Sequence, residues 1–327
     1  MARKYNATEL INLVRDEARI PNTASTGNAD SDILNRINEY MLDTLVGLVM
    51  EVKDEYFVRT IRQPLAASTS RYRIPDRAMY QKLRDIRYIG SNTENGYSSL
   101  AHISVGSLDS SRSSTSTNNI PSAFRIEGNH IVLWPAISAG AQGSIDIAYY
   151  LTPGELGLPS AAAVVTGKNT DRTQATFVDG TVPTAWTAAD TFDIHSPNSG
   201  AEVKAVGRSI SSLGTTAINF SEAVDGSVTG EYELEIGDYV CLTGEAALPG
   251  LPRELHPLIA IGAACTILQD EGDMDVYQAK LGLLERSLFG RPDGKSIGAI
   301  GRMQNRVDAR PIYVTGGRFL AAQDRYA

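Results

Sequence analysis

The spacing of apolar residues changes twice along this chain, and that change constrains the fold more than any other feature. Near both ends of the 327-residue sequence, apolar side chains recur at helical spacing, which predicts amphipathic helices. Between these regions the period falls to two, which predicts strands. The apolar stripes near the C-terminal end have no local partner, so we expect the two helical regions to pack on each other.

The first helical region carries two start signals. Asn6 with Glu9 three residues later has the pattern of an N-terminal capping box. After a polar stretch, Asp30 or Ser31 is the expected cap of a second helix, which runs to Val52. The short connection between the two helices favours an antiparallel pair.

A second helical hairpin is predicted near the other end. One stripe runs from Leu255 to Leu268 and another from Val276 to Leu288. Gly272 is placed to end the first helix and Asp273 to cap the second.

Short strands with alternating apolar residues follow the first helices. They are expected at 57–61, 71–74, 86–89, 124–126, 131–133 and 145–149. Gly128 and Asn129 form a turn signal between two of them, which predicts a hairpin. We expect these strands to form an antiparallel meander on the helices, interrupted by a polar loop at 106–119.

Residues 156–247 have a different character, rich in Thr, Ala, Val, Gly and Asp, with short strands at 191–194, 202–206, 217–220 and 238–242. Twelve acidic and four basic residues give this segment a charge of −8. The pattern predicts an inserted all-β barrel or sandwich. The chain is therefore expected to be an α+β protein with a helical core and β-meander at 1–155 and 248–289, an inserted β domain at 156–247, and a C-terminal tail at 290–327.

The tail differs from the rest of the chain in charge. Seven basic and three acidic residues make residues 290–327 net +4, which leaves −12 on the body because the whole chain carries −8. Its apolar residues have no period, so we expect an extended segment that could reach on the order of 120 Å. Such a segment is expected to become ordered by docking on an acidic partner, the alternative being a terminus without a partner.

Catalytic and metal-binding patterns are missing from the sequence. His102, His130, His195 and His256 are too far apart for metal-ligand pairs and are expected at the surface or at caps. Residues 290–296 (GRPDGKS) have one residue too few between the glycines for a phosphate loop and are interpreted as a turn. We therefore predict a protein that is not an enzyme and has no cofactor and no metal.

Three further features allow a specific expectation. Glu231, Glu233 and Glu235 alternate in a predicted strand, which would place three carboxylates on one solvated face, with a cation site as the alternative. Cys241 and Cys265 lack metal or redox spacing and are expected to be buried thiols. The sequence contains no run of apolar residues long enough for a membrane span.

The order of the predicted parts resembles that of the head-to-tail adaptor (connector, or head-completion) proteins of tailed bacteriophages. The residues that carry the resemblance are 31–39 (SDILNRINE), 121–135 (PSAFRIEGNHIVLWP), 149–153 (YYLTP), 251–258 (LPRELHPL) and 271–273 (EGD). The 156–247 segment departs from the minimal pattern of that family, so its role is not given by the resemblance.

The resemblance implies a structural virion protein at the neck of the particle, assembled in the host cytoplasm. Members of the family form a homo-oligomeric ring, commonly of about twelve copies, below the portal protein. The implied partners are the portal, further copies of the chain, tail, nozzle or fibre proteins, and genomic DNA that passes through the channel without sequence-specific binding. An acidic ring repels phosphates, which favours sliding of DNA during ejection.

The resemblance also implies that the C-terminal tail contacts the portal. The residues expected to make this contact are Arg291, Arg302, Met303, Arg306, Val307, Arg310, Ile312, Tyr313, Val314, Arg318 and Phe319.

Two other functions remain open from the sequence. A tail or baseplate protein could use the β domain to bind other virion proteins or a glycan, for which Trp186, Phe192 and Tyr239 are the candidate exposed aromatics. A hydrolase with a β accessory domain would depend on a polar residue such as His256 or Asp238.

Overall fold

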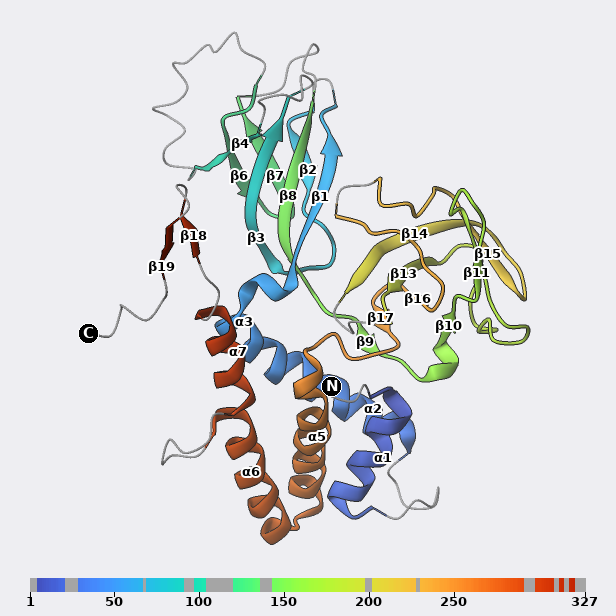
Figure 1. Ribbon diagram of the computed structural model, residues 1–327, viewed down its shortest axis with the longest axis vertical. Coiled ribbons are helices and arrows are strands. Elements are labelled where there is room, and N and C mark those ends of the chain that lie inside the picture. The colour runs from blue at the N-terminus through green and yellow to red at the C-terminus, as the bar shows by residue number, and fades with distance from the viewer. Residues whose placement is uncertain are drawn as a thin grey trace.

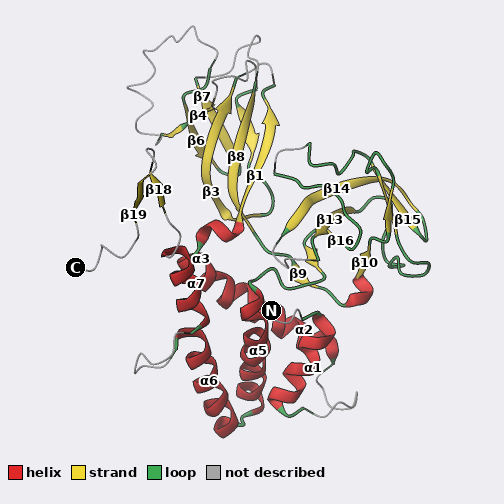
Figure 2. Cartoon of the chain, viewed as in Figure 1, coloured by secondary structure: helices red, strands yellow, loops and turns green. Residues whose placement is uncertain are grey.

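The computed structural model describes residues 5–20, 29–66, 69–90, 97–103, 120–135, 143–197, 202–227, 230–290, 298–308, 312–314 and 318–320. Helices gather at one end, and several mostly antiparallel sheets make up the rest (Figure 1, Figure 2). The predicted α+β class is confirmed at this level. The predicted polar loop at 106–119 lies outside the described residues.

The helical layer contains six described α-helices. They are α1 Ala7–Ala18, α2 Asp30–Glu39, α3 Val46–Val52, α5 His256–Glu271, α6 Met274–Phe289 and α7 Ala299–Asp308. The predicted capping box of α1 is confirmed: Asn6 Oδ1 accepts from the Glu9 N–H at 2.9 Å, and Glu9 accepts from the Asn6 N–H at 3.1 Å. Gly272 ends α5 with φ 79°, and Asp273 caps α6 by accepting from the Val276 N–H, both as predicted.

The second helical segment differs from its prediction in two ways. Its N-cap is Ala29, without a side-chain hydrogen bond, so the expected cap at Asp30 or Ser31 is wrong. A π-helical turn, Tyr40–Leu45, joins α2 to α3. At this turn the Tyr40 ring lies against Gly262 of α5, where a Cβ would be only 2.0 Å from the ring. Glycine at that position therefore permits close approach of the two helices.

The strands that follow form two four-stranded sheets, ordered β1-β8-β3-β4 and β2-β7-β6-β5. Their bounds are β1 Val58–Pro64, β2 Arg71–Arg73, β3 Ala78–Ile89, β4 Tyr97–Ser99, β5 Ala101–His102, β6 Ala123–Glu127, β7 His130–Trp134 and β8 Ser144–Leu151. The hairpin across Gly128 is confirmed. The meander is wrong, because β8 pairs with β1 and β3 rather than with β7.

The two sheets enclose an apolar cluster of their own, with Ile86, Ile131, Ile145 and Ile147 at its centre. The helices form a separate cluster, to which the strands add a few residues, such as Met79 of β3 and Tyr150 of β8. The single core predicted for the helices and the strands therefore divides into two clusters. A sheet with two packed faces can bury its apolar residues against another sheet, without a helix.

Residues 155–247 form a seven-stranded antiparallel sheet, ordered β10-β16-β13-β14-β15-β12-β11, and a two-stranded parallel pair, β9 with β17. The bounds are β9 Glu155–Leu156, β10 Ala162–Val164, β11 Gly167–Lys168, β12 Gln174–Thr176, β13 Thr191–His195, β14 Val203–Leu213, β15 Ala217–Phe220, β16 Tyr239–Leu242 and β17 Glu245–Ala246. A third apolar cluster lies within this part of the chain, around Phe192, Ile218 and Leu234.

The C-terminal segment is not extended throughout, which corrects the prediction for 290–327. Gly298 leads into α7, and Ala299, Ile300 and Met303 are buried in the helical cluster. A Cβ at Gly298 would lie 2.2 Å from the Leu288 carbonyl oxygen, so α7 starts in close contact with the end of α6. Beyond α7, β18 Ile312–Val314 and β19 Arg318–Leu320 pair as an antiparallel hairpin.

Candidate functional site

The residues predicted to contact a portal do not lie in one kind of structure. Arg302, Met303, Arg306 and Val307 are on α7, while Ile312, Tyr313, Val314, Arg318 and Phe319 are in the hairpin. Arg291 and Arg310 lie outside the described residues.

Among the residues expected to contact the portal, Met303 lies in an apolar core. It is only 9% exposed and packs in the helical cluster, whereas Arg302 on the same helix is exposed. The expectation of an extended segment is therefore wrong at the start of α7. The apolar spacing of Ala299, Ile300 and Met303 was compatible with a helix, but the pattern covers little more than one turn.

The hairpin β18–β19 is the part of the C-terminal segment that the structure describes beyond α7. Its strands pair with each other, and no other described strand pairs with them. Figure 1 shows the hairpin beyond the end of α7, to the left of the four-stranded sheets. Among the described strands, the outer edges of the hairpin therefore have no partner.

A second feature is the junction between the two four-stranded sheets, β1 to β8, and the 155–247 region. Two arginines connect the two sides of this junction. Arg59 of β1 is 8% exposed and donates to the carbonyl oxygens of Val203, at 2.6 Å, and Lys204, at 3.3 Å. Arg77, in the turn before β3, forms an ion pair with Asp193 of β13 and donates to the Thr152 carbonyl at 2.7 Å.

Asp193 is fully buried at this junction and has a complete set of partners. Besides Arg77, it accepts from the backbone N–H groups of Gly207, at 2.8 Å, and Gly244, at 3.1 Å. A buried carboxylate is stable only with such compensation, so Asp193 fixes the relative positions of three segments. A third link joins the helices to β9: the Asn38 side chain exchanges two hydrogen bonds with the backbone of Leu156, at 2.8 and 3.1 Å.

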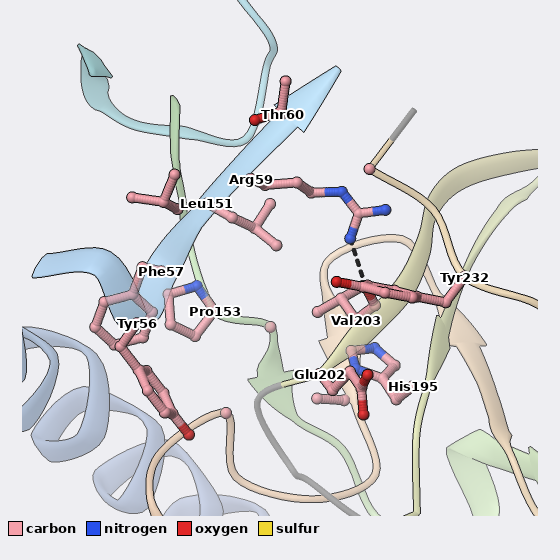
Figure 3. A pocket seen from close by; sticks show the side chains of 15 residues that line it. Tyr56, Phe57, Arg59, Thr60, Leu151, Pro153, His195, Glu202, Val203 and Tyr232 are labelled. Carbon is pink, nitrogen blue, oxygen red and sulfur yellow. Dashed lines mark hydrogen bonds between the residues drawn. The ribbon is translucent and has the colours of Figure 1, made fainter. Parts of the chain in front are cut away.

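A pocket of about 400 Å³ opens where the helical layer, β1 and the 155–247 region meet (Figure 3). One wall is mostly apolar and includes Tyr56, Phe57 and Pro153. The opposite wall carries Arg59, His195, Glu202, Val203 and Tyr232. Gly230 closes the rim: with φ +83°, it lies so close to β1 that a Cβ would be 1.8 Å from the Thr60 carbonyl oxygen.

The three alternating glutamates do not form the predicted strand face. Glu233 makes an isolated bridge with Asp225, and the segment around it has no strand. Each carboxylate pairs with its own cations: Glu231 with Arg208, Glu233 with Lys168 and Arg172, and Glu235 with Lys204. Within the described residues, no group of three or more His, Cys, Asp or Glu side chains could hold a metal ion.

Lys204 organises part of this charge network from a buried position. Its side chain is 5% exposed, and its Nζ donates to the Glu235 carboxylate at 2.7 Å and lies 3.1 Å from Asp238 Oδ2. Burial on its own lowers the pKa of a lysine, but the bonds to Glu235 and Asp238 together raise the pKa of Lys204 above its ordinary value.

The expectation that each histidine lies at the surface or at a cap is wrong for His195, which is buried in β13; His256 is buried too, but it is the C-cap residue of the 3-10 helix Arg253–Leu255. His195 is 3% exposed and His256 is 1% exposed. His195 Nε2 lies 3.0 Å from the Glu245 carbonyl oxygen, and His256 Nε2 lies 3.1 Å from that of Leu251. Burial lowers the pKa of His195 to about 4, so this side chain is neutral near pH 7.

The two cysteines are buried free thiols, as predicted. Burial raises the pKa of Cys241 to about 12 and also raises the pKa of Cys265. Two of the aromatics considered for glycan binding are buried as well: Trp186 and Phe192 pack edge to face, with ring centroids 4.9 Å apart. Tyr239 is partly exposed, on β16.

Sequence reasoning missed the residues of the junction. Arg59, Arg77 and Asp193 are isolated charges in the sequence and have the appearance of surface residues. The one available signal was the alternation in β13, where Asp193 lies between Phe192 and Ile194 and therefore on the opposite face of the strand.

No protein-family model matches this chain, and no curated protein matches its sequence. Among the described residues, no helix is both long enough and apolar enough to cross a membrane.

Proposed function

We propose that this protein is a structural head-to-tail adaptor of a virion, which forms a ring below a portal protein and joins the capsid to the tail. The ring would commonly contain about twelve copies and would enclose part of the channel through which DNA leaves the particle. The order of the sequence motifs supports this proposal, and the observation that carries it is the hairpin β18–β19 within the basic C-terminal segment.

An isolated two-stranded hairpin is marginally stable in water, and a third strand or a packed face is needed to hold it. In the described part of the chain, no third strand pairs with β18 or β19. A partner could supply the missing strand by β-augmentation. The net +4 of residues 290–327 would favour an acidic partner surface.

An inserted domain is compatible with the same proposal, although the resemblance does not assign it a role. Residues 1–155 and 248–289 would form the adaptor core, and residues 156–247 the insertion. The chain leaves toward this region at β9 and returns at β17, and these two strands lie side by side as a parallel pair. Entry and exit at one place are typical of a domain inserted into a loop.

Charge supports the channel role. The body carries −12, of which −8 lies in residues 156–247. A ring that repeats this charge repels DNA phosphates and would let the genome slide. The protein would be located at the virion neck and would assemble in the host cytoplasm.

The test is removal of the hairpin without disturbance of the helical layer. Deletion of residues 309–327 keeps α7 and its buried Ala299, Ile300 and Met303, so the shortened protein is expected to fold. Mixed with portal rings, the full chain is expected to add a ring visible in negative-stain images, and the shortened chain is not. Binding retained without residues 309–327 would contradict the docking role.

A charge variant refines this test. Arg310→Glu with Arg318→Glu changes the docking segment, and Arg71→Glu with Arg73→Glu makes the same charge change on β2, where both side chains are more than half exposed. Only the first pair is expected to weaken portal binding. Equal weakening by both pairs would indicate a general charge effect.

A tail or baseplate protein remains the second candidate, because the 155–247 region exposes apolar side chains. Tyr232 is 55% exposed and Ile236 is 65% exposed on the same loop. With Trp186 and Phe192 buried, this surface favours a virion protein as partner over a glycan. Ile236→Asp is expected to abolish particle assembly without loss of portal binding if this candidate is correct.

A further inference from the structure

The pocket at the junction contains a buried cation without a carboxylate partner. Arg59 donates to two backbone carbonyls, and it forms no ion pair with any carboxylate in the described part of the chain. The two carboxylates whose charges act on Arg59, the buried Asp193 and the half-buried Glu231, are already held by Arg77 and Arg208. Burial lowers the pKa of Arg59, which reflects the cost of keeping its charge away from water.

The same wall contains a buried acceptor without a donor. A carbonyl oxygen can only accept, so the contact with Glu245 requires the proton of His195 to be on Nε2. Nδ1 is then an acceptor, and it has no hydrogen-bond partner among the described residues. An unmatched buried acceptor destabilises the protein, and a ligand with a suitable donor would remove that cost.

These two groups line one pocket with an apolar opposite wall. In Figure 3, Arg59, Tyr232 and His195 follow one another along the same side, and Glu202 lies beside His195. The volume of about 400 Å³ is in the range of small-molecule sites, which are mostly apolar with a few polar groups. The negative charge of Glu202 favours a singly charged carboxylate over a phosphate.

We propose that this pocket binds a carboxylate-bearing ligand, whose carboxylate pairs with Arg59 and whose adjacent N–H or O–H group donates to His195. An acylated amino acid has both groups, and so does the free C-terminus of a protein chain. The proposal does not depend on the adaptor function.

The probe is N-acetylphenylalanine, which combines a carboxylate, an adjacent N–H and a ring for the apolar wall. Two matched compounds each lack one group: N-acetylphenylalanine amide lacks the charge, and 3-phenylpropanoate lacks the N–H. Titration calorimetry on the full chain is expected to show N-acetylphenylalanine binding about tenfold more tightly than either compound.

Variants keep the test independent of folding defects. Glu202→Gln removes the negative charge next to the site and is expected to tighten binding of the acid several-fold, a gain that misfolding does not produce. Tyr232→Ala is expected to weaken binding. Tyr80→Ala removes an exposed tyrosine outside the pocket, at 91% exposure, and is expected to leave binding unchanged.

The source of the carboxylate is settled by a peptide of nine residues that ends in phenylalanine. Binding tighter than that of the small acid identifies a protein C-terminus, and exclusion of the peptide identifies a free small molecule. Equal binding of acid and amide, no binding of any probe at millimolar concentration, or no gain in Glu202→Gln would overturn the proposal.

Discussion

The helical layer and the 155–247 region bury different kinds of side chain. The β region contains the buried polar residues Asp193, His195, Ser196, Lys204, Arg208 and Asp238, whereas the helices bury only Arg15 and His256 among those described. Apolar burial is non-directional and scales with area. A buried charge instead depends on particular partners, so the β region should be the more brittle of the two, both to loss of one partner and to acid.

The largest effect is expected where a buried charge loses its partner. Asp193→Ala leaves Arg77 without its carboxylate and two backbone N–H groups without an acceptor, which should cost about 3–5 kcal/mol. Urea unfolding followed by Trp186 fluorescence, with Trp134 replaced by Phe, measures this in the β region. Asp190→Ala, which removes an exposed turn hydrogen bond, should cost less than about 1 kcal/mol. Similar losses in the two variants would contradict the role of Asp193.

Truncation in the helical layer should have a comparable or slightly smaller effect. Leu45 is fully buried, and Leu45→Ala should cost about 2–5 kcal/mol from lost burial and the cavity left behind. Replacement of the partly buried Leu48 by Ala should cost less free energy of unfolding. Urea unfolding followed by circular dichroism at several pH values should give the same loss at each pH. A loss that changes with pH would place titrating groups in this core.

The next largest effect is expected at low pH, which should destabilise the 155–247 region more than the helical layer. The pKa of His195 is about 4 in the folded protein against 6.5 as its ordinary value, so between these values the unfolded chain binds a proton that the folded chain does not. The contribution of neutral His195 to the free energy of unfolding is complete above about pH 6.5 and is lost as the pH falls toward 4. The total loss is up to about 3 kcal/mol. His195→Gln should flatten this part of the pH profile measured by Trp186 fluorescence. An unchanged slope would show that other groups cause the acid sensitivity.

The smallest effect is expected at the surface of the helical layer. Arg36 is 42% exposed and pairs with the 57% exposed Asp270 at 2.6 Å. Arg36→Ala should cost less than about 1 kcal/mol, and the difference should vanish in 1 M salt. Comparison of the wild type and the variant at low and high salt checks this. A larger or salt-independent cost would mean that this pair is not screened by solvent.

Local signals explain what could be predicted from the sequence. The capping box of Asn6 and Glu9, the turn at Gly128, and the stop and start at Gly272 and Asp273 each depend on residues within a few positions of one another. Such signals locate elements without knowledge of the rest of the fold.

Long-range pairing explains what could not be predicted. Alternation in β8 indicates which side chains face inward but not that the strand lies between β1 and β3. The start of α7 is recognised as buried only when its contact with α6 is known. Likewise, Arg59 and His195 are brought to one pocket from positions 136 residues apart in the sequence.

The central functional claim is that the body folds by itself and the hairpin is held by a partner. Amide hydrogen exchange of the isolated chain, then of the chain bound to portal rings, tests this most directly. We expect residues 299–303 to be protected in both samples, because α7 packs in the helical cluster, and residues 312–320 to gain protection only with the portal. Protection of the hairpin in the isolated chain, or its fast exchange in the complex, would contradict the account.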